Sequence, residues 1–122
     1  MSPGFRTPAR TGDRAQRPAV RLAVLAARAM LKAHPDWPPA LGPVQVAQFC
    51  LESGFGKSMP AGSSNPFGIK ARDGEAFAEA DTWEVVGGQR VRCKARFRKF
   101  GSLAEAFESH GRLLVERKRQ SG

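Results

Sequence analysis

The 122-residue sequence contains no tyrosine and only two cysteines, Cys50 and Cys93. Two cysteines are too few for a disulfide framework, and they lack the close paired spacing of a zinc site. We therefore expect no metal site and interpret both cysteines as buried thiols. A disulfide between them in an oxidising compartment is the alternative.

Long apolar runs are also missing from the sequence. No stretch is apolar enough to cross a membrane, so we expect no transmembrane segment. The only candidate for the apolar part of a signal peptide runs from Ala19 to Met30, and Arg21 and Arg28 interrupt it. The sequence thus shows no clear signal peptide and does not indicate an export route.

Acidic residues are scarce, with 11 Asp and Glu against 20 Lys and Arg and a formal net charge of +9. The acidic residues are most frequent between Trp37 and Gln89, and basic residues dominate the segments on either side. Such a chain is attracted either to nucleic acid or to an anionic surface such as a bacterial wall. Its aromatic residues do not interleave with arginine as they do in proteins that bind single-stranded nucleic acid, so nucleic-acid binding is the weaker alternative.

The first 17 residues have almost no apolar content and predict a disordered basic tail. A helix is then expected from Pro18 to Ala33, because apolar residues recur there at helical spacing. The predicted apolar stripe consists of Leu22, Leu25, Ala26, Ala29 and Ala33.

A second helix is predicted from Pro43 to Ser53, ending at Gly54, which can adopt the left-handed conformation that closes a helix. Glu52 then lies in the last turn, beside unpaired carbonyls and the negative end of the helix dipole. That position and partial desolvation both raise a carboxyl pKa, as a general acid working near neutral pH requires. The Gly-, Ser- and Pro-rich loop that follows should form one wall of a cleft, anchored to the core by Phe67 and Ile69.

A β-hairpin is predicted between Thr82 and Phe97, around a Gly-Gly pair. In its second arm apolar residues alternate with arginine and lysine, which indicates a half-buried strand with a basic outer face. A two- or four-residue loop would place Glu84 on the side of Val91, whereas a three-residue loop would turn it toward the arginines. The sequence leaves these alternatives open.

A third helix is predicted from Ser102 to Glu116, because Ser102 and Glu105 have the spacing of a capping box. His110 falls on its apolar side, and we interpret it as a core histidine with an internal hydrogen bond. Residues 117–122 should fray. Three amphipathic helices and one hairpin predict an α+β protein that is mainly helical with a small β-hairpin lobe.

Several motifs resemble the glucosaminidase family of peptidoglycan hydrolases, glycoside hydrolase family 73. They are AQ at 47–48, LESGFGKS at 51–58 and NPFGIK at 65–70. Phe55 stands where tryptophan is commoner in that family, and Pro66 stands where leucine is commoner. The resemblance resumes at TWE (82–84), ARFRKF (95–100) and SHGRLL (109–114), so it covers most of the chain after the first predicted helix.

The resemblance implies a lysozyme-like fold in which Glu52 is the catalytic general acid and Glu84 matches a second glutamate on the β-lobe. It implies endo-β-N-acetylglucosaminidase activity, the hydrolysis of the β-1,4 bond after N-acetylglucosamine in cell-wall glycan, with no cofactor or metal. Whether the enzyme inverts the anomeric centre or uses the substrate's N-acetyl group stays open, and so does muramidase specificity. The substrate-binding residues that it implies are Gln48, Ser53, Phe55, Asn65, Phe67 and Thr82.

The resemblance also implies that the chain acts on peptidoglycan as a monomer at the bacterial cell wall or in the periplasm, without specific nucleic-acid binding. A non-catalytic wall-binding module of the same fold is the first alternative. Family members usually continue past the HGRLL helix with helical sequence that contributes a tyrosine to the cleft. We therefore expect residues 18–122 to form a catalytic domain that is C-terminally incomplete relative to the family.

Overall fold

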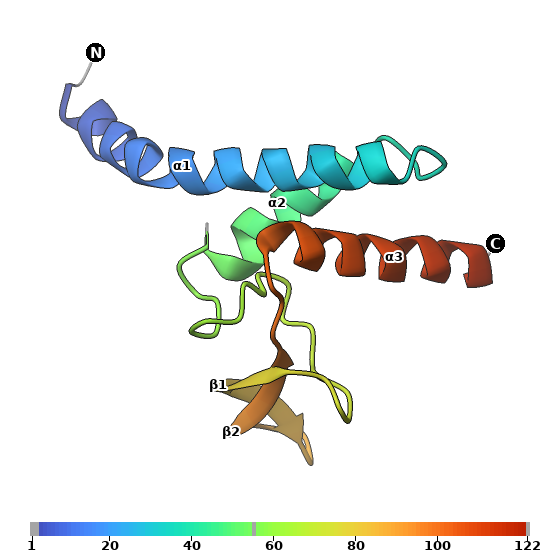
Figure 1. Ribbon diagram of the computed structural model, residues 1–122. Coiled ribbons are helices and arrows are strands. Elements are labelled where there is room, and N and C mark those ends of the chain that lie inside the picture. Colours follow the sequence, from blue (N-terminus) through green and yellow to red (C-terminus); the bar gives the residue numbers. More distant parts are fainter. Residues whose placement is uncertain (1–2, 55, 122) are drawn as a thin grey trace.

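The computed structural model describes residues 3–54 and 56–121 (Figure 1). Within them the chain forms three helices and one antiparallel hairpin, which confirms the predicted α+β class. The helices gather at one end of the molecule, and the hairpin projects from them at the other (Figure 1). The elements in chain order are α1 (Pro3–Ala33), α2 (Leu41–Ser53), β1 (Phe77–Val86), β2 (Gln89–Arg98) and α3 (Leu103–Ser121).

Helix α1 begins at Pro3, whereas the sequence predicts a disordered tail up to Arg17 and a helix start at Pro18. Proline and glycine at several positions in this segment favour an irregular chain, which is why the sequence does not indicate a helix. Adding residues to an existing helix is less costly than nucleating a new one, and Ala, Arg and Gln are good helix formers. The structure therefore extends the packed helix toward the N-terminus.

The buried face of α1 is lined by small side chains and one methionine. Ala23, Ala26, Ala27 and Met30 are at most 6% exposed. The predicted stripe was confirmed only at Ala26: Leu22 and Leu25 are 59% and 53% exposed, and Ala29 and Ala33 are exposed as well. Because α2 and α3 both pack on this helix, small residues at the contact let the helix axes approach closely.

Helix α2 begins at Leu41, just before the predicted start at Pro43, and ends at Ser53 as predicted. Proline in the first turn removes an N–H group that has no partner there in any case. Gly54 has φ 57° and ψ 49°, and its N–H group donates to the carbonyl of Cys50. The predicted left-handed helix end is thus confirmed, and it places Glu52 in the final turn.

The predicted hairpin is confirmed, with strands that run from Phe77 to Arg98 and a two-residue loop, Gly87-Gly88, between Val86 and Gln89. Both glycines have positive φ, as the tightest hairpin turns require. This register pairs Glu84 with Val91 and so selects the even-loop alternative.

Helix α3 is capped at Ser102, whose hydroxyl accepts a hydrogen bond from the Glu105 N–H group at 3.2 Å. The Glu105 carboxylate reaches back to the N–H group of Gly101 at 2.8 Å, one residue earlier than in the usual capping box. The helix continues to Ser121, so the predicted fraying from residue 117 is not seen in the described residues.

The core lies where the three helices meet the loop after α2. Phe107 and Phe49 are almost completely buried, and Trp37 and Phe67 are less than 10% exposed. Cys50 and Cys93 are free and partly buried, so the disulfide alternative is not realised. Among the described residues, no helix combines the length and the apolar character needed to cross a bilayer.

Candidate active site

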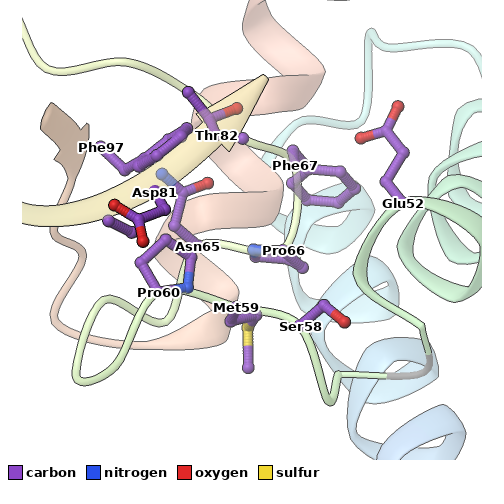
Figure 2. A pocket seen from close by; sticks show the side chains of 12 residues that line it. Glu52, Ser58, Met59, Pro60, Asn65, Pro66, Phe67, Asp81, Thr82 and Phe97 are labelled. Atoms are coloured by element: carbon purple, nitrogen blue, oxygen red, sulfur yellow. The ribbon is translucent and has the colours of Figure 1, made fainter. Parts of the chain in front are cut away.

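A pocket of about 560 Å³ opens between the end of α2, the loop after it and the inner face of the hairpin (Figure 2). Glu52 lies on the α2 side and Thr82 on the hairpin side. The loop between Glu52 and Thr82 forms the floor of the pocket. The loop residues are Ser58, Met59, Pro60, Asn65, Pro66, Phe67 and Gly68, and the hairpin residues are Ala80, Asp81, Thr82 and Phe97.

Glu52 is held at the pocket by the end of its helix. Its residue is exposed overall, but the neighbouring walls partly desolvate the carboxyl group and raise its pKa above the ordinary value. A carboxyl group with a raised pKa keeps its proton to higher pH than a fully solvated one. Glu52 therefore has the position and the electrostatic environment of a general acid.

Ser53 supports this helix end from within the protein. Its hydroxyl donates to the Phe49 carbonyl and accepts a hydrogen bond from the Gly56 N–H group at 2.8 Å. Ser53 is 1% exposed and does not line the pocket. The residue predicted to contact substrate thus supports the turn that follows Glu52.

Asn65 ties the loop to the hairpin. Its amide nitrogen donates to the carbonyls of Ile69 and Arg98 at 2.8 and 2.9 Å, and its amide oxygen accepts from the Ile69 N–H group. The side chain is 1% exposed, although the residue lines the pocket. Through these three hydrogen bonds Asn65 holds the pocket wall in place.

Phe67 lines the pocket and also packs into the core, as predicted for the loop anchor. Its ring lies parallel to the His110 ring at a centroid distance of 4.0 Å and meets Phe107 edge-on at 5.0 Å. Ile69 packs against the same core. The loop wall is therefore attached to α3.

Glu84 is not brought to the pocket lining. It lies on the same strand face as Thr82, two residues closer to the hairpin turn, and its carboxylate accepts a hydrogen bond from Lys70 at 2.5 Å. This ion pair raises the pKa of Lys70. The sequence did not indicate this partner, because it lies 14 positions away across the loop.

Another predicted substrate contact does not reach the pocket. Gln48 is partly buried on α2, and its amide oxygen has no hydrogen-bond partner within residues 3–54 and 56–121. It does not line the pocket. Phe55 lies outside the described residues.

Asp81 lines the pocket and was missed by the sequence prediction (Figure 2). Its carboxylate pairs with Arg92 at 2.9 Å on the outer side of the hairpin. Its position directly before Thr82, on a strand already assigned to the cleft, was the available signal. Asp81 is thus a carboxylate at the edge of the pocket that is paired with Arg92, as Glu84 is paired with Lys70.

The arrangement suits acid catalysis on a polymer. One protonatable carboxyl group stands on one wall, apolar rings and a threonine stand on the others, and the pocket is open to solvent along the hairpin. Within the described chain, no three His, Cys, Asp or Glu side chains gather to hold a metal ion.

Residues 40–122 match the family of glucosaminidases described as mannosyl-glycoprotein endo-β-N-acetylglucosaminidase. The chain is 34% identical over 73 residues to exo-glucosaminidase LytG of Bacillus subtilis, covering 59% of this chain and 26% of that protein. It is 42% identical over 76 residues to the peptidoglycan hydrolase FlgJ of Pseudomonas aeruginosa, covering 57% and 19%. The chain therefore spans about a quarter or less of the length of these relatives.

The fold is similar to solved structures as well. The crystal structure of the catalytic domain of the autolysin Auto from Listeria monocytogenes aligns with a TM-score of 0.65 at 26% identity. The alignment covers 79% of this chain and 54% of that one. The resemblance thus includes the spatial arrangement of the helices and the hairpin.

Proposed function

This chain belongs to the glucosaminidase family, and from that membership we propose that it is a peptidoglycan hydrolase that cleaves the β-1,4 bond after N-acetylglucosamine. The observation that carries the proposal is Glu52, which stands at the end of α2 and faces a pocket built from the family's motifs. The match over residues 40–122 includes every element of that pocket.

In the proposed reaction Glu52 gives its proton to the glycosidic oxygen, and the bond to the leaving sugar breaks. The raised pKa supports this role, because the group must be protonated when substrate binds. Water then adds to the oxocarbenium-like carbon of the other sugar and gives up a proton to a carboxylate, either directly or after the substrate's own N-acetyl oxygen has captured the cation. Glu84 is our candidate for that carboxylate, and its ion pair with Lys70 holds the side chain on the hairpin.

The remaining predicted residues have two kinds of role in this proposal. Thr82 and Phe67 line the pocket and can contact a sugar with a hydroxyl group and an aromatic edge. Asn65 and Ser53 act by holding the loop and the end of α2 in place, as their burial and internal hydrogen bonds indicate. We keep Gln48 as a substrate contact on its motif alone. We keep Phe55 as a substrate contact on the strength of its motif.

The proposed partner is bacterial peptidoglycan, and the proposed place of action is the cell wall. The net charge of +9 attracts the chain to anionic wall polymers without reading any sequence in nucleic acid. We propose that the protein acts as a monomer.

The test is to digest purified peptidoglycan with the chain, reduce the products with borohydride and identify the reduced sugar by mass spectrometry. We expect N-acetylglucosaminitol at the new ends. Reduced N-acetylmuramic acid would overturn the bond assignment in favour of a muramidase. Binding to the wall with no new reducing ends would indicate a non-catalytic wall-binding module.

A further inference from the structure

The end of the hairpin carries a group of apolar side chains that the core does not use. Trp83 is 52% exposed, and Val85 and Val86 next to the turn are 74% and 63% exposed. Val91, on the neighbouring strand, is 41% exposed. Trp83 and Val85 point to the outer face of the hairpin, whereas Val86 and Val91 point to the opposite face, so exposed apolar side chains surround the hairpin end on both faces. Single exposed apolar residues are ordinary on a protein surface, but several of them gathered at one projecting end indicate an interaction site.

Cations lie beside Trp83 and Val85 on the outer face of β2. Arg90 lies opposite Val85, Arg92 lies opposite Trp83, and the Arg90 guanidinium stands over the Trp83 ring at 4.7 Å. Farther along the strand Arg96 covers Phe77 in the same way at 4.6 Å. Among the residues that the structure describes, neither Arg90 nor Arg96 forms an ion pair with a carboxylate.

The acidic residues of β1 offset only part of this charge. Asp81 pairs with Arg92 at 2.9 Å, and Glu79 approaches Lys94 at 4.0 Å. The outer face therefore keeps an excess of positive charge beside the apolar end. The hairpin residues that line the catalytic pocket are Ala80, Asp81, Thr82 and Phe97, which all lie farther from the turn than Trp83 and Val85.

The position of the hairpin leaves its end accessible. The strands project away from the three helices (Figure 1), and in the part of the chain that the structure describes no helix packs beside the end of the hairpin. Trp83, Val85 and Val86 can therefore meet an extended surface without any movement of the helical part.

We propose that the hairpin end, defined as Trp83, Val85, Val86 and Arg90, binds the surface of an anionic phospholipid bilayer. Tryptophan is enriched at the membrane interface, aliphatic side chains can enter the acyl boundary, and arginine pairs with phosphate groups. A soluble polyanion would need the arginines but has no apolar phase to receive the valines. The bilayer is the partner that uses both features.

The experiment uses the whole chain and vesicles of phosphatidylglycerol mixed with phosphatidylcholine, compared with pure phosphatidylcholine. Trp37 is 6% exposed and Trp83 is 52% exposed, so a change of tryptophan emission on vesicle addition reports Trp83. We expect a blue shift and quenching by brominated acyl chains only with the anionic vesicles. Trp83→Phe should abolish this signal while sedimentation with vesicles persists.

Two variants separate the apolar and the charged contributions. The double variant Val85→Ser/Val86→Ser should weaken vesicle binding about tenfold, and Arg90→Gln about fivefold. Leu51→Ser and Arg21→Gln are matched controls, since both residues are exposed on helices and neither belongs to the hairpin end. Circular dichroism checks that each variant is folded.

The proposal is overturned if anionic vesicles cause no blue shift or quenching, or if both hairpin variants bind as tightly as the controls. It is also overturned if the valine variant binds normally and soluble polyphosphate displaces the vesicles completely, because the face would then be a polyanion site. We expect light scattering of samples without vesicles to show a monomer. Dimerisation lost in the valine variant would instead assign the hairpin end to a second copy of the chain.

Discussion

Phe67 and His110 lie face to face, with ring centroids 4.0 Å apart and planes inclined by 5°. Phe67 belongs to the pocket wall and His110 to α3, so the stack joins the substrate side of the molecule to its core. On the other side of His110, the Gln45 amide donates to Nδ1 at 3.0 Å and to the Phe107 carbonyl at 2.9 Å. Because the Gln45 amide donates to Nδ1, this ring nitrogen must carry no proton.

The first prediction is that acid destabilises the fold through His110. Burial, and to a lesser extent the nearby Arg117 charge, lower the pKa of His110 to about 4 from 6.5. Between these values the unfolded chain binds more protons than the folded one, so stability falls as pH drops through this window. Above pH 6.5 the contribution is fully present.

Urea unfolding from pH 4 to 7 checks this prediction. His110→Asn keeps an acceptor for Gln45 but cannot titrate, so it should show a shallower loss of stability toward acid pH than the parent. Equal slopes for parent and variant would show that other groups cause the acid sensitivity.

Local rules were enough to predict the position of Glu52. Gly54 ends the helix by its backbone conformation, and that conformation is a property of glycine itself. The two-residue turn of the hairpin was one of two even-length alternatives, and the Gly-Gly pair takes the positive φ that it needs. These features depend on neighbours in sequence, so they can be read from the sequence.

Features that depend on packing partners could not be read in the same way. Leu22 and Leu25 have the right spacing for a core stripe, but α2 and α3 dock on the adjacent face, where the alanines lie. The partner of Glu84 is Lys70, which reaches it only because the loop folds against the hairpin. Hydrophobicity and spacing do not specify which of two faces a second helix covers.

The second prediction concerns the close approach of α3 to α1 at Gly111. A Cβ atom there would lie 2.7 Å from the Met30 sulfur and 3.0 Å from the Trp37 ring. Gly111→Ala should therefore lower the unfolding free energy by about 1 to 3 kcal/mol through overpacking. Urea denaturation measures this change in the unfolding free energy.

A matched control for Gly111 is Gly101→Ala. Its new methyl group would meet only the flexible carboxylate end of Glu105, at 3.0 Å. We expect a much smaller change there. If both variants have the same stability as the parent, the helix contact is looser than the structure indicates.

The third prediction is that Glu84→Gln lowers wall-lytic activity by on the order of tenfold, which is a smaller loss than removal of the general acid causes. Glu84 is proposed to stabilise the oxocarbenium-like charge or to orient water, and an amide can still form a hydrogen bond. Its ion pair with Lys70 is exposed, so the variant should unfold at the parent's urea concentration. Turbidity clearing of purified walls gives the rate.

Glu79→Gln is the control for Glu84, because it removes a carboxylate from the opposite face of the same strand. It should retain full activity. Equal rates for both variants and the parent would remove Glu84 from the mechanism and leave Glu52 to act with water alone.

The fourth prediction is that Glu52→Gln lowers wall-lytic activity by about a hundredfold or more, because an amide keeps the shape of the side chain but cannot deliver a proton. Stability should stay unchanged, since Glu52 is exposed and makes no core contact. In the parent, activity should decline toward alkaline pH as Glu52 ionises. Because its pKa is raised, that decline should begin at higher pH than for an ordinary glutamate.

The control for Glu52 is Glu116→Gln, which removes an exposed carboxylate on α3 and should behave as the parent. The residual activity of Glu52→Gln should lack the alkaline decline, since no group at that position can lose a proton. A variant that clears walls at the parent's rate would exclude Glu52 as the acid. A slow variant that keeps the parent's pH profile would assign the titration to a different group, so rate and profile together decide whether Glu52 donates the proton.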